Sequence, residues 1–492
     1  MISVVAWGQR SGTAPAGQTP VAPLQDDKPV VTKHETTVRG RTLRYSVNTG
    51  FLPIRNEAGE AEASMFYMAY TLETSEPAAR RPLLFSFNGG PGSASVWLHL
   101  GALGPKRVKM MPDGSMPPAP YELVTNEHTW LDQADLVFID PVGTGYSRAI
   151  KPDLARKFNG VRGDIASVGE FIRLYLTRNE RWSSPLFLAG ESYGTTRAAG
   201  LSGYLADRGI AFNGIVLISS ILNFQTARFT KGNDLPFVLF LPTYTATAWY
   251  HKRLPAELQK DLRATLAEVK LWANGAYAGA LAKGDTLSAA DRQSIAAALS
   301  KYTGLSRIYV ENANLRIEID QFCKELARDK QTIVGRLDTR LTGWDGMNTN
   351  QRYEHDPSNS AIRPPYTATF ADYVRRELGF KSDLNYYILG GGIAPWDWGA
   401  ANEGFPDTSD ALRAALARNP HMKVFVASGY YDLATPFFAT EYTLSHLGID
   451  ARVKSNFTTA YYEAGHMMYI HEPSLEKLRN DVRAFITKAL AK

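Results

Sequence analysis

Short hydrophobic runs alternate with helical patterns along much of the chain. The runs end mostly at Gly, Pro or Asp and lie at residues 82–87, 134–139, 185–189, 213–222 and 424–427. Runs of this length between turn residues are typical of strands buried on both faces. The segment IASVGEFIRLYLTRN, residues 165–179, instead repeats its apolar residues at helical spacing. Strands that alternate with helices indicate a parallel sheet covered on both faces, so we predict an α/β core.

Two parts of the chain depart from this alternation. Residues 42–48 and 64–72 alternate polar and apolar positions, which predicts antiparallel strands with one solvated face. From about residue 223 to 387 the patterns are mainly helical, and Ser288 is expected to cap one of these helices. We interpret this block as a largely helical insertion, or cap, over the sheet, since such insertions commonly shape a substrate cleft.

These patterns predict the following organisation of the chain. A leader rich in Pro, Gly and Ala precedes two halves of the α/β core, which the cap interrupts. The predicted bounds are 1–30 for the flexible leader, 31–222 for the first part of the core, 223–387 for the cap and 388–492 for the second part of the core.

A serine stands between two glycines at residues 190–194, which read GESYG. A predicted strand, 185–189, comes before it and a predicted helix, 195–205, follows it. This context fits a nucleophile elbow, a sharp strand-to-helix turn that lifts the hydroxyl of Ser192 out of the sheet. An ordinary strand-to-helix loop is the alternative, because five residues alone are a weak motif.

A serine nucleophile needs a base and a third group that orients the base. In α/β-hydrolase folds the chain order is Ser, then Asp or Glu, then His. Asp432 follows the run 424–427, and His466 follows a strand-like segment and precedes a terminal amphipathic pattern. We therefore predict Ser192, Asp432 and His466 as a catalytic triad on an α/β-hydrolase fold, with a mostly parallel central sheet and helices on both faces.

Three nearby residues compete for these roles. His446 lies in a helical pattern and is expected near a helix end, where the helix dipole favours a cation. His471 precedes Glu472-Pro473 and is expected in the first turn of a helix, and Asp450 follows Gly448-Ile449 and resembles a turn residue. The triad also needs amide donors for the oxyanion, and we expect one from Tyr193 and one from the segment NGGPGSAS that follows Phe87.

Composition and charge limit the classes of partner and cofactor that the protein is expected to bind. The chain of 492 residues is 44% hydrophobic and 21% charged, which is typical of globular proteins. No segment reaches the roughly 18 apolar residues of a membrane span, and the net charge of +5 comes without a long basic run, so we expect neither a membrane span nor nucleic acid binding. Cys323 is the single cysteine and is expected to be a buried hydrophobic residue; no Cys/His set has zinc spacing, and we predict no metal or cofactor.

Five ordered segments give the chain a specific resemblance. They read FNGGPGSASVWLHLGALGP, NEHTWLDQADLVFIDPVGTGYS, LFLAGESYG, SGYYDLATP and EAGHMMYIHEP. Together they resemble the serine carboxypeptidase family from about residue 64 to the C-terminus, with the cap the least similar part. The resemblance implies hydrolysis of the C-terminal peptide bond of peptides through an acyl-enzyme on Ser192.

The resemblance also implies roles for residues beside the triad. Gly90 and Tyr193 amides would form the oxyanion hole, and Asn88, Gly89 and Glu191 would bind the free carboxylate of the substrate. A protonated Glu191 can donate a hydrogen bond to that carboxylate, so binding is expected to be best at acidic pH. The alternative is that Glu191 only packs at the turn.

Two departures from the family pattern stand out. Many members carry a second Glu that shares a proton with the first, but Ala102 occupies that position here, which leaves the pH optimum open. After GESY the usual residues are replaced by GTTRAAG, and we expect Arg197 to pair on the helix surface, with a place near the site as the alternative. The disulfides common in eukaryotic relatives are absent, which suits a bacterial-type member.

The family resemblance and the leader favour a periplasmic or secreted protein, although MISVVAW lacks the charged start of a signal peptide. Some relatives pair as dimers, so a homodimer stays open.

Two other functions compete with the peptidase: an esterase or acyltransferase that uses the same triad on a non-peptide substrate, and an inactive binding protein, which a complete Ser, Asp and His set disfavours. The preferred residues on either side of the cleaved bond are expected to depend largely on the cap, the part of the chain least similar to the family.

Overall fold

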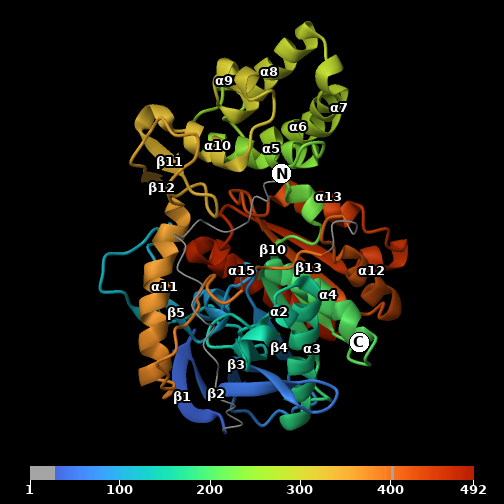
Figure 1. The fold of residues 1–492 in the computed structure, drawn as a ribbon. Helices are drawn as coiled ribbons and strands as arrows, with labels where there is room; N and C mark the ends of the chain where they lie inside the picture. The colour runs from blue at the N-terminus through green and yellow to red at the C-terminus, as the bar shows by residue number, and fades with distance from the viewer. Residues whose placement is uncertain (1–27, 394, 400–403, 492) are drawn as a thin grey trace.

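The computed structural model describes residues 28–491 except 394 and 400–403, so most of the predicted leader lies outside the described residues. One ten-stranded sheet runs through the core in the order β1-β2-β3-β7-β4-β9-β10-β13-β14, with β8 paired to β3 (Figure 1). The strands of this sheet are β1 (Val30–Val38), β2 (Arg41–Arg55), β3 (Ala61–Leu72), β4 (Leu83–Phe87), β7 (Asp135–Ile139), β8 (Arg148–Ala149), β9 (Leu186–Ser192), β10 (Gly214–Ser220), β13 (Lys423–Gly429) and β14 (Phe457–Tyr462).

The six strands from β7 to β14 in this order run parallel, whereas β1, β2 and β3 pair antiparallel at the other end. Both arrangements confirm the sequence-based prediction. Two small hairpins lie outside the main sheet, β5 (Lys106–Val108) with β6 (Leu123–Thr125) and β11 (Thr332–Val334) with β12 (Thr342–Trp344).

Helices cover both faces of the parallel part of the sheet. Alternate residues of one strand join different cores, as the two-residue period of a strand requires. Leu188 belongs to the buried cluster that includes residues of α3 (Val161–Arg178), α4 (Tyr193–Ala206) and α12 (Ser409–Arg418), whereas Phe187 belongs to the cluster that includes residues of α11 (Pro357–Arg376) and α15 (Glu472–Leu490). The helices of the core are α1 (Val96–Leu98), α2 (Ala155–Phe158), α3 (Val161–Arg178), α4 (Tyr193–Ala206), α12 (Ser409–Arg418), α13 (Phe437–Ser445), α14 (Ala451–Lys454) and α15 (Glu472–Leu490).

The helical insertion stands beyond the edge of the sheet at which the parallel strands end (Figure 1). Its helices are α5 (Leu235–Tyr250), α6 (Leu262–Trp272), α7 (Ala278–Lys283), α8 (Ala289–Thr303), α9 (Arg307–Asn312), α10 (Ile319–Glu325) and α11 (Pro357–Arg376). Ser288 caps α8 by accepting a hydrogen bond from the Asp291 amide, as predicted. Cys323 is buried in α10, also as predicted. The exact bounds of the cap stay a prediction.

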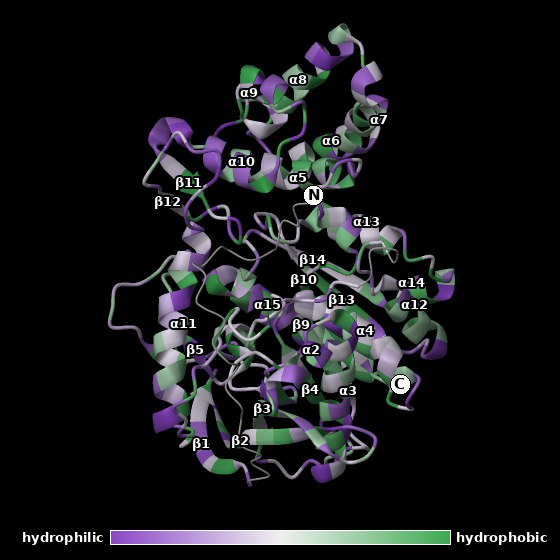
Figure 2. Cartoon of the chain, in the orientation of Figure 1, coloured by the Kyte–Doolittle hydropathy of each residue, from purple (hydrophilic) through white to green (hydrophobic). Residues whose placement is uncertain are grey.

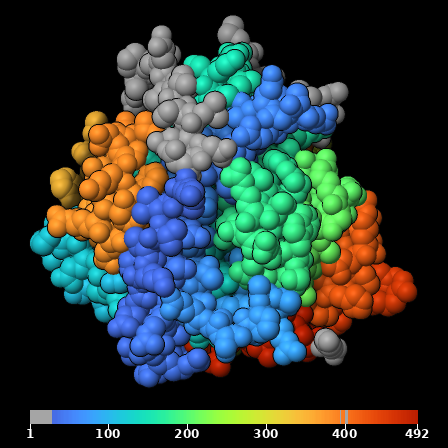
Figure 3. All heavy atoms as spheres, turned by 90° about the horizontal axis from the view of Figure 1, so that it is seen from below, coloured from blue at the N-terminus to red at the C-terminus, as the bar shows by residue number. Residues whose placement is uncertain are grey.

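The helix α11 leaves the cap and runs down the side of the sheet to the N-terminal strands (Figure 1). Seen from below, β1 and β2 lie between α11 and the helices of residues 161–206 (Figure 3). Several cap helices carry both hydrophilic and hydrophobic residues along their length, as expected for helices with one packed face (Figure 2). No helix of the described segments has the length and apolarity that crossing a bilayer requires.

The core of the cap is continuous with the loops that follow the parallel strands. Phe240 and Phe322 of the cap belong to the same buried cluster as Tyr431 and Leu433, which flank Asp432. The cap is therefore packed directly onto the end of the sheet where the predicted triad residues lie.

Candidate active site

Ser192 ends β9 and directly precedes α4, in the sharp turn that the sequence predicts. Its backbone has φ 60° and ψ −132°, a strained conformation for a residue with a side chain. The flanking glycines have no room for a side chain, because a Cβ on Gly190 would lie 2.2 Å from the Gly194 carbonyl oxygen. This strained and crowded turn is the geometry of a nucleophile elbow.

The end of the neighbouring strand supports the turn. The Thr195 hydroxyl donates to the Ser192 carbonyl at 2.6 Å and accepts from the Ile221 amide at 2.9 Å. In β10, Ser219 also has a positive φ of 51°, and its hydroxyl donates to the His466 carbonyl at 2.6 Å. The end of β10 is thus bonded both to the serine turn and to the histidine loop.

Asp432 and His466 form a buried pair. His466 Nδ1 lies 2.8 Å from Asp432 Oδ2, and because a carboxylate only accepts, we assign the proton to Nδ1 and leave Nε2 free to act as a base. The loop after Asp432 orients this carboxylate, since the Ala434 and Thr435 amides donate to Oδ1 at 2.7 and 3.0 Å. Burial opposes the charged form of His466, but the nearby acids, Asp432 foremost, together outweigh burial, and the pKa of His466 lies above its usual value.

The three predicted triad residues follow the carboxyl ends of β9, β13 and β14. Carboxyl ends of parallel strands lie at one edge of a sheet, where ligands bind in open α/β folds. In the described part of the chain no hydrogen bond joins the Ser192 hydroxyl to His466. Such bonds are often long before a substrate binds.

The competing residues have the local roles that the sequence suggests. His446 ends α13, where its Nδ1 lies 2.7 Å from the Tyr442 carbonyl oxygen. His471 caps α15 and bonds Ser474, and Asp450 caps α14.

Asn88 and Glu191, the predicted carboxylate-binding residues, are in direct contact. Asn88 Nδ2 donates to Glu191 Oε1 at 2.9 Å, and Asn88 Oδ1 accepts from the Leu98 amide at 3.0 Å. Gly89 lies against the backbone of the serine turn, because a Cβ there would be 2.4 Å from the Tyr193 nitrogen. Gly90 has a φ of +98°, which favours glycine. The loop after β4 therefore packs tightly on the turn after β9.

The environment of Glu191 favours its neutral form. Burial raises the pKa of Glu191 to about 7, although His466, Tyr469 and Asn88 each lower it. Glu191 Oε2 and the Tyr469 hydroxyl are both buried without a hydrogen-bond partner, which is rare for buried polar atoms. The Tyr469 hydroxyl lies close enough to the Glu191 carboxyl to lower its pKa as a weak hydrogen-bond donor, although the two groups do not meet full hydrogen-bonding geometry.

Ala102 is fully buried in a single π-helical turn, His99–Leu103. A Cβ on the adjacent Gly101 would lie 2.4 Å from a Tyr469 ring carbon and 2.6 Å from the Tyr366 hydroxyl. Two phenol side chains thus pack beside the position of the missing second acid, and the raised pKa of Glu191 comes from burial. Sequence reasoning missed Tyr469, which only the 3₁₀ turn Met468–Ile470 after His466 brings to this place.

The expected place of Arg197 was wrong. Its side chain does not lie on the surface but is 1% exposed and bonded to Asp164 of α3. The reason is that α4 has almost no solvated face: it packs on β9 and β10 and against both α3 and α12. Small residues such as Gly200 and Gly203 allow this close approach, since a Cβ on either would meet a neighbouring helix.

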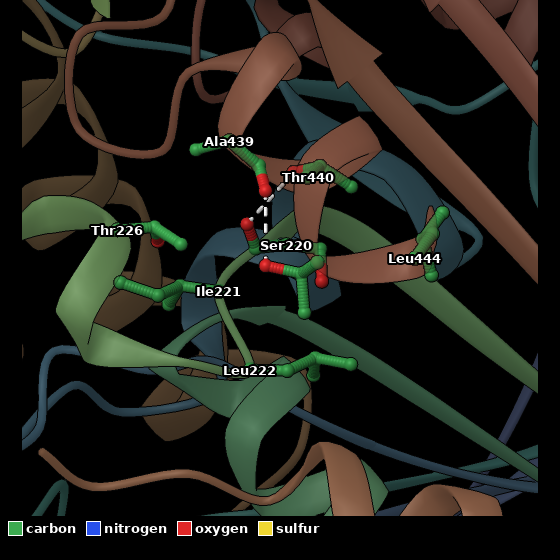
Figure 4. A pocket seen from close by; sticks show the side chains of 8 residues that line it. Ser220, Ile221, Leu222, Thr226, Ala439, Thr440 and Leu444 are labelled. Carbon is green, nitrogen blue, oxygen red and sulfur yellow. Dashed lines mark hydrogen bonds between the residues drawn. The ribbon is translucent and has the colours of Figure 1, made fainter. Parts of the chain in front are cut away.

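A cavity of about 10 Å³ lies behind the serine turn, between the end of β10 and α13 (Figure 4). Thr440 Oγ1 donates to the Ser220 carbonyl across it at 3.0 Å. This volume holds one water molecule at most, so the cavity is a packing void and not a substrate site. Its lining residues are Ser220, Ile221, Leu222, Thr226, Ala439, Thr440, Thr443 and Leu444.

A sequence profile of the serine carboxypeptidase family matches residues 39–478 of the chain. Serine carboxypeptidase-like 11 of Arabidopsis thaliana is 30% identical over 154 residues, which are 31% of this chain and 33% of that protein. Pheromone-processing carboxypeptidase KEX1 of Saccharomyces cerevisiae is 32% identical over 158 residues, which are 30% of this chain and 20% of that protein. The aligned part therefore spans a third or less of each of these relatives.

The crystal structure of a prohormone-processing carboxypeptidase from Saccharomyces cerevisiae, KEX1(delta)p, matches the fold. It covers 89% of this chain and 91% of that chain, with a TM-score of 0.50 and 18% sequence identity. At this identity the likeness shows the fold alone. The predicted α/β-hydrolase fold, with its mostly parallel sheet and its helical insertion, is confirmed.

Proposed function

The chain belongs to the serine carboxypeptidase family, and on this premise we propose that it is a serine-type carboxypeptidase that hydrolyses the C-terminal peptide bond of peptides. The main support for the proposal is the buried hydrogen bond between Asn88 and Glu191. Glu191 directly precedes the strained Ser192. An esterase needs a triad and an oxyanion hole, but it has no use for a buried amide–carboxyl pair beside its nucleophile. A substrate with a free carboxylate does.

The first half of the reaction forms an acyl-enzyme. His466 Nε2 takes the proton of the Ser192 hydroxyl while Ser192 Oγ attacks the carbonyl carbon of the last peptide bond. Asp432 holds the imidazole in the required tautomer and stabilises the imidazolium that forms. The amides of Gly90 and Tyr193 donate to the oxyanion of the tetrahedral intermediate. The C–N bond then breaks, and His466 gives its proton to the nitrogen of the departing amino acid.

The second half reverses these roles. A water molecule loses a proton to His466 Nε2 and attacks the acyl carbon, and the same two amides stabilise the second tetrahedral intermediate. The bond to Ser192 Oγ breaks, the serine recovers its proton from His466, and the shortened peptide leaves with a new C-terminal carboxylate.

The substrate carboxylate is recognised by Asn88, the Gly89 amide and neutral Glu191. Because Asn88 donates to Glu191 Oε1, the proton of the neutral carboxyl belongs on Oε2, the oxygen that has no partner. A bound carboxylate supplies the acceptor that this proton lacks. The raised pKa of Glu191 keeps the proton in place up to about neutral pH.

The proposed partners are peptides with a free C-terminus, and a homodimer is compatible with the proposal. We also propose, from the family resemblance, that the protein works in the periplasm or outside the cell. Fractionation of the producing cells tests the location, and sedimentation tests the oligomeric state.

Mass spectrometry of an unmodified peptide incubated with the enzyme tests the activity. The proposal predicts a ladder of products that lose residues one at a time from the C-terminus, and no ladder with the Ser192→Ala variant. Internal cleavage, or a ladder that Ser192→Ala also produces, contradicts it.

A further inference from the structure

Arg197 and Asp164 form an ion pair that is almost completely removed from solvent. Arg197 Nε donates to Asp164 Oδ2 at 2.8 Å, and the two side chains are 1% and 3% exposed. The pair joins the middle of α4 to the first turn of α3. A buried pair of this kind adds little net stability, because desolvation of both charges offsets their attraction. Its presence here needs another reason.

The remaining bonds of the pair lead to the candidate site. Arg197 Nη1 donates to the Asn88 backbone carbonyl at 2.6 Å, and the Tyr193 hydroxyl donates to Asp164 Oδ2 at 3.1 Å. The guanidinium also lies over the rings of Phe87 and Tyr193, at 5.1 and 5.2 Å from their centroids. The pair therefore binds the loop after β4 and the first residue of α4 at the same time.

The segments that begin at Asn88 and at Tyr193 supply the oxyanion donors and the carboxylate-binding groups. The reaction requires these groups to stay at a fixed distance from one another. Asn88 begins the segment with Gly89 and Gly90, which supplies one oxyanion donor and the carboxylate-binding groups. Tyr193 supplies the other oxyanion amide. Gly89 touches the Tyr193 backbone so closely that it has no room for a Cβ, so a small shift of either segment changes the geometry of both sets of donors.

We propose that Arg197 and Asp164 are positioning residues that fix the Asn88–Gly90 segment relative to Tyr193, and thereby set the geometry of the oxyanion hole and of the carboxylate site. This inference rests on the proposed function. Neither residue touches the substrate. Arg197 acts through the Asn88 carbonyl, and Asp164 acts through the guanidinium and the Tyr193 hydroxyl.

The geometry predicts unequal effects on two classes of substrate. Without the Arg197 guanidinium the Asn88 carbonyl loses its hydrogen-bond donor. The Asn88 side chain and the Gly90 amide are then both expected to shift. A peptide with a free carboxylate uses both groups, whereas a simple ester of the same acyl group uses only the oxyanion donor. A misplacement of about 1 Å costs about 100-fold in rate. We therefore expect the free-acid substrate to suffer more than the ester.

The test compares Arg197→Met and Arg197→Lys with a matched control, Arg479→Lys. Arg479 is a buried arginine of α15 whose partner, Asp132, is 2.7 Å away and outside the site. For each variant kcat and KM are measured on an N-blocked dipeptide and on an ester of its N-blocked amino acid, together with the unfolding midpoint. For Arg197→Met we expect kcat/KM to fall about 100-fold on the dipeptide and about tenfold on the ester. Arg197→Lys should recover part of the loss, because one ammonium group cannot reach both acceptors as the fork does.

An equal fall on both substrates, of the size that Arg479→Lys produces, overturns the positioning role, because a merely structural role lowers only the amount of folded enzyme. If the wild-type enzyme does not cleave the dipeptide, the proposed function is wrong. The positioning role of Arg197 is then tested by a reaction that needs no substrate carboxylate. Inactivation by a phosphonofluoridate requires the serine and the oxyanion donors but no substrate carboxylate. Arg197→Met must slow that reaction about tenfold relative to Arg479→Lys, and equal rates overturn the inference.

Discussion

Asn88 Nδ2 lies 2.9 Å from Glu191 Oε1, although the two residues are 103 positions apart in the sequence. The bond joins the loop after β4 to the turn after β9, directly beside Ser192. It also fixes which oxygen of Glu191 is free for a ligand. Since burial raises the pKa of Glu191 to about 7, this oxygen carries a proton in acidic and neutral solution and loses it above. Under the proposed function, substrate binding should therefore depend on pH through this proton.

Glu191→Gln should remove the pH dependence of binding at the alkaline end. In the wild-type enzyme KM for a free-acid dipeptide should rise as the pH passes about 7, because ionised Glu191 repels the substrate carboxylate. A glutamine donates a hydrogen bond at every pH, so its KM should stay flat. Because Glu191 is already neutral at acidic pH, the acidic limb of kcat, which follows His466, should stay in place in the variant.

Glu318→Gln is the matched control for this experiment. Glu318 begins α10 in the cap, and burial raises the pKa of this acid too, but it lies outside the candidate site. A Glu191→Gln enzyme whose KM still rises above pH 7, or a Glu318→Gln enzyme that loses the rise, contradicts the role of Glu191.

The stability of the protein should depend on the same proton. The pKa of Glu191 is about 7 in the folded protein against 4.5 in the unfolded chain, so the folded state binds the proton more tightly. The wild-type free energy of unfolding should therefore fall as the pH rises from about 4.5 to 7, by about 3 kcal/mol from this group. Glu191→Gln lacks this loss. Denaturant unfolding at pH 4 and pH 8 measures the free energy of unfolding of both proteins. The value for the variant minus the value for the wild type should be about 3 kcal/mol larger at pH 8 than at pH 4. The same difference at both pH values would refute the raised pKa.

Tyr469→Phe should extend binding to higher pH. The Tyr469 hydroxyl lowers the pKa of Glu191, so its removal should raise this pKa above about 7 and move the alkaline rise of KM upward. Tyr277→Phe is the control, because Tyr277 is a buried cap tyrosine whose hydroxyl donates to the Leu315 carbonyl at 2.6 Å. KM profiles of the two variants check the prediction, and a downward shift for Tyr469→Phe would be the contrary result.

Gly89→Ala should disrupt the site, because the surrounding backbone has little room to move away from the added methyl group. The new Cβ would lie 2.4 Å from the Tyr193 nitrogen and 2.7 Å from the Gly194 nitrogen, and neither backbone atom can move without breaking the turn at Ser192. We expect kcat/KM to fall at least about 100-fold and the protein to lose about 1–3 kcal/mol of stability. Gly279→Ala in α7 has free space around it and should stabilise its helix slightly. An active Gly89→Ala enzyme would show that the loop does not pack on the turn as described.

The sequence carries the order of strands and the turn residues that end them, and these suffice to predict the α/β core and the placement of Ser192, Asp432 and His466. Such residues are predictable because a parallel sheet brings the ends of its strands to one edge. His446, His471 and Asp450 could be set aside for the same reason, since each begins or ends a helix.

Arg197 and Tyr469 show where sequence reasoning fails. An arginine in a helix is usually solvated, and only the packing of α4 against α3 and α12 buries this one against Asp164. Tyr469 lies three residues after His466, and its approach to Glu191 depends on a local turn and on the absence of side chain volume at Gly101. Both contacts join segments far apart in the sequence, and no local pattern marks them.

The most direct test of the central claim is hydrolysis of an N-blocked dipeptide, its C-terminal amide and the matching ester by the wild-type enzyme between about pH 4 and 8. We expect fast cleavage of the free acid, little cleavage of the amide, and loss of this preference in Asn88→Ala. Cleavage of the ester alone would contradict the account: the triad would then be active, but the pair of Asn88 and Glu191 would not recognise a substrate carboxylate.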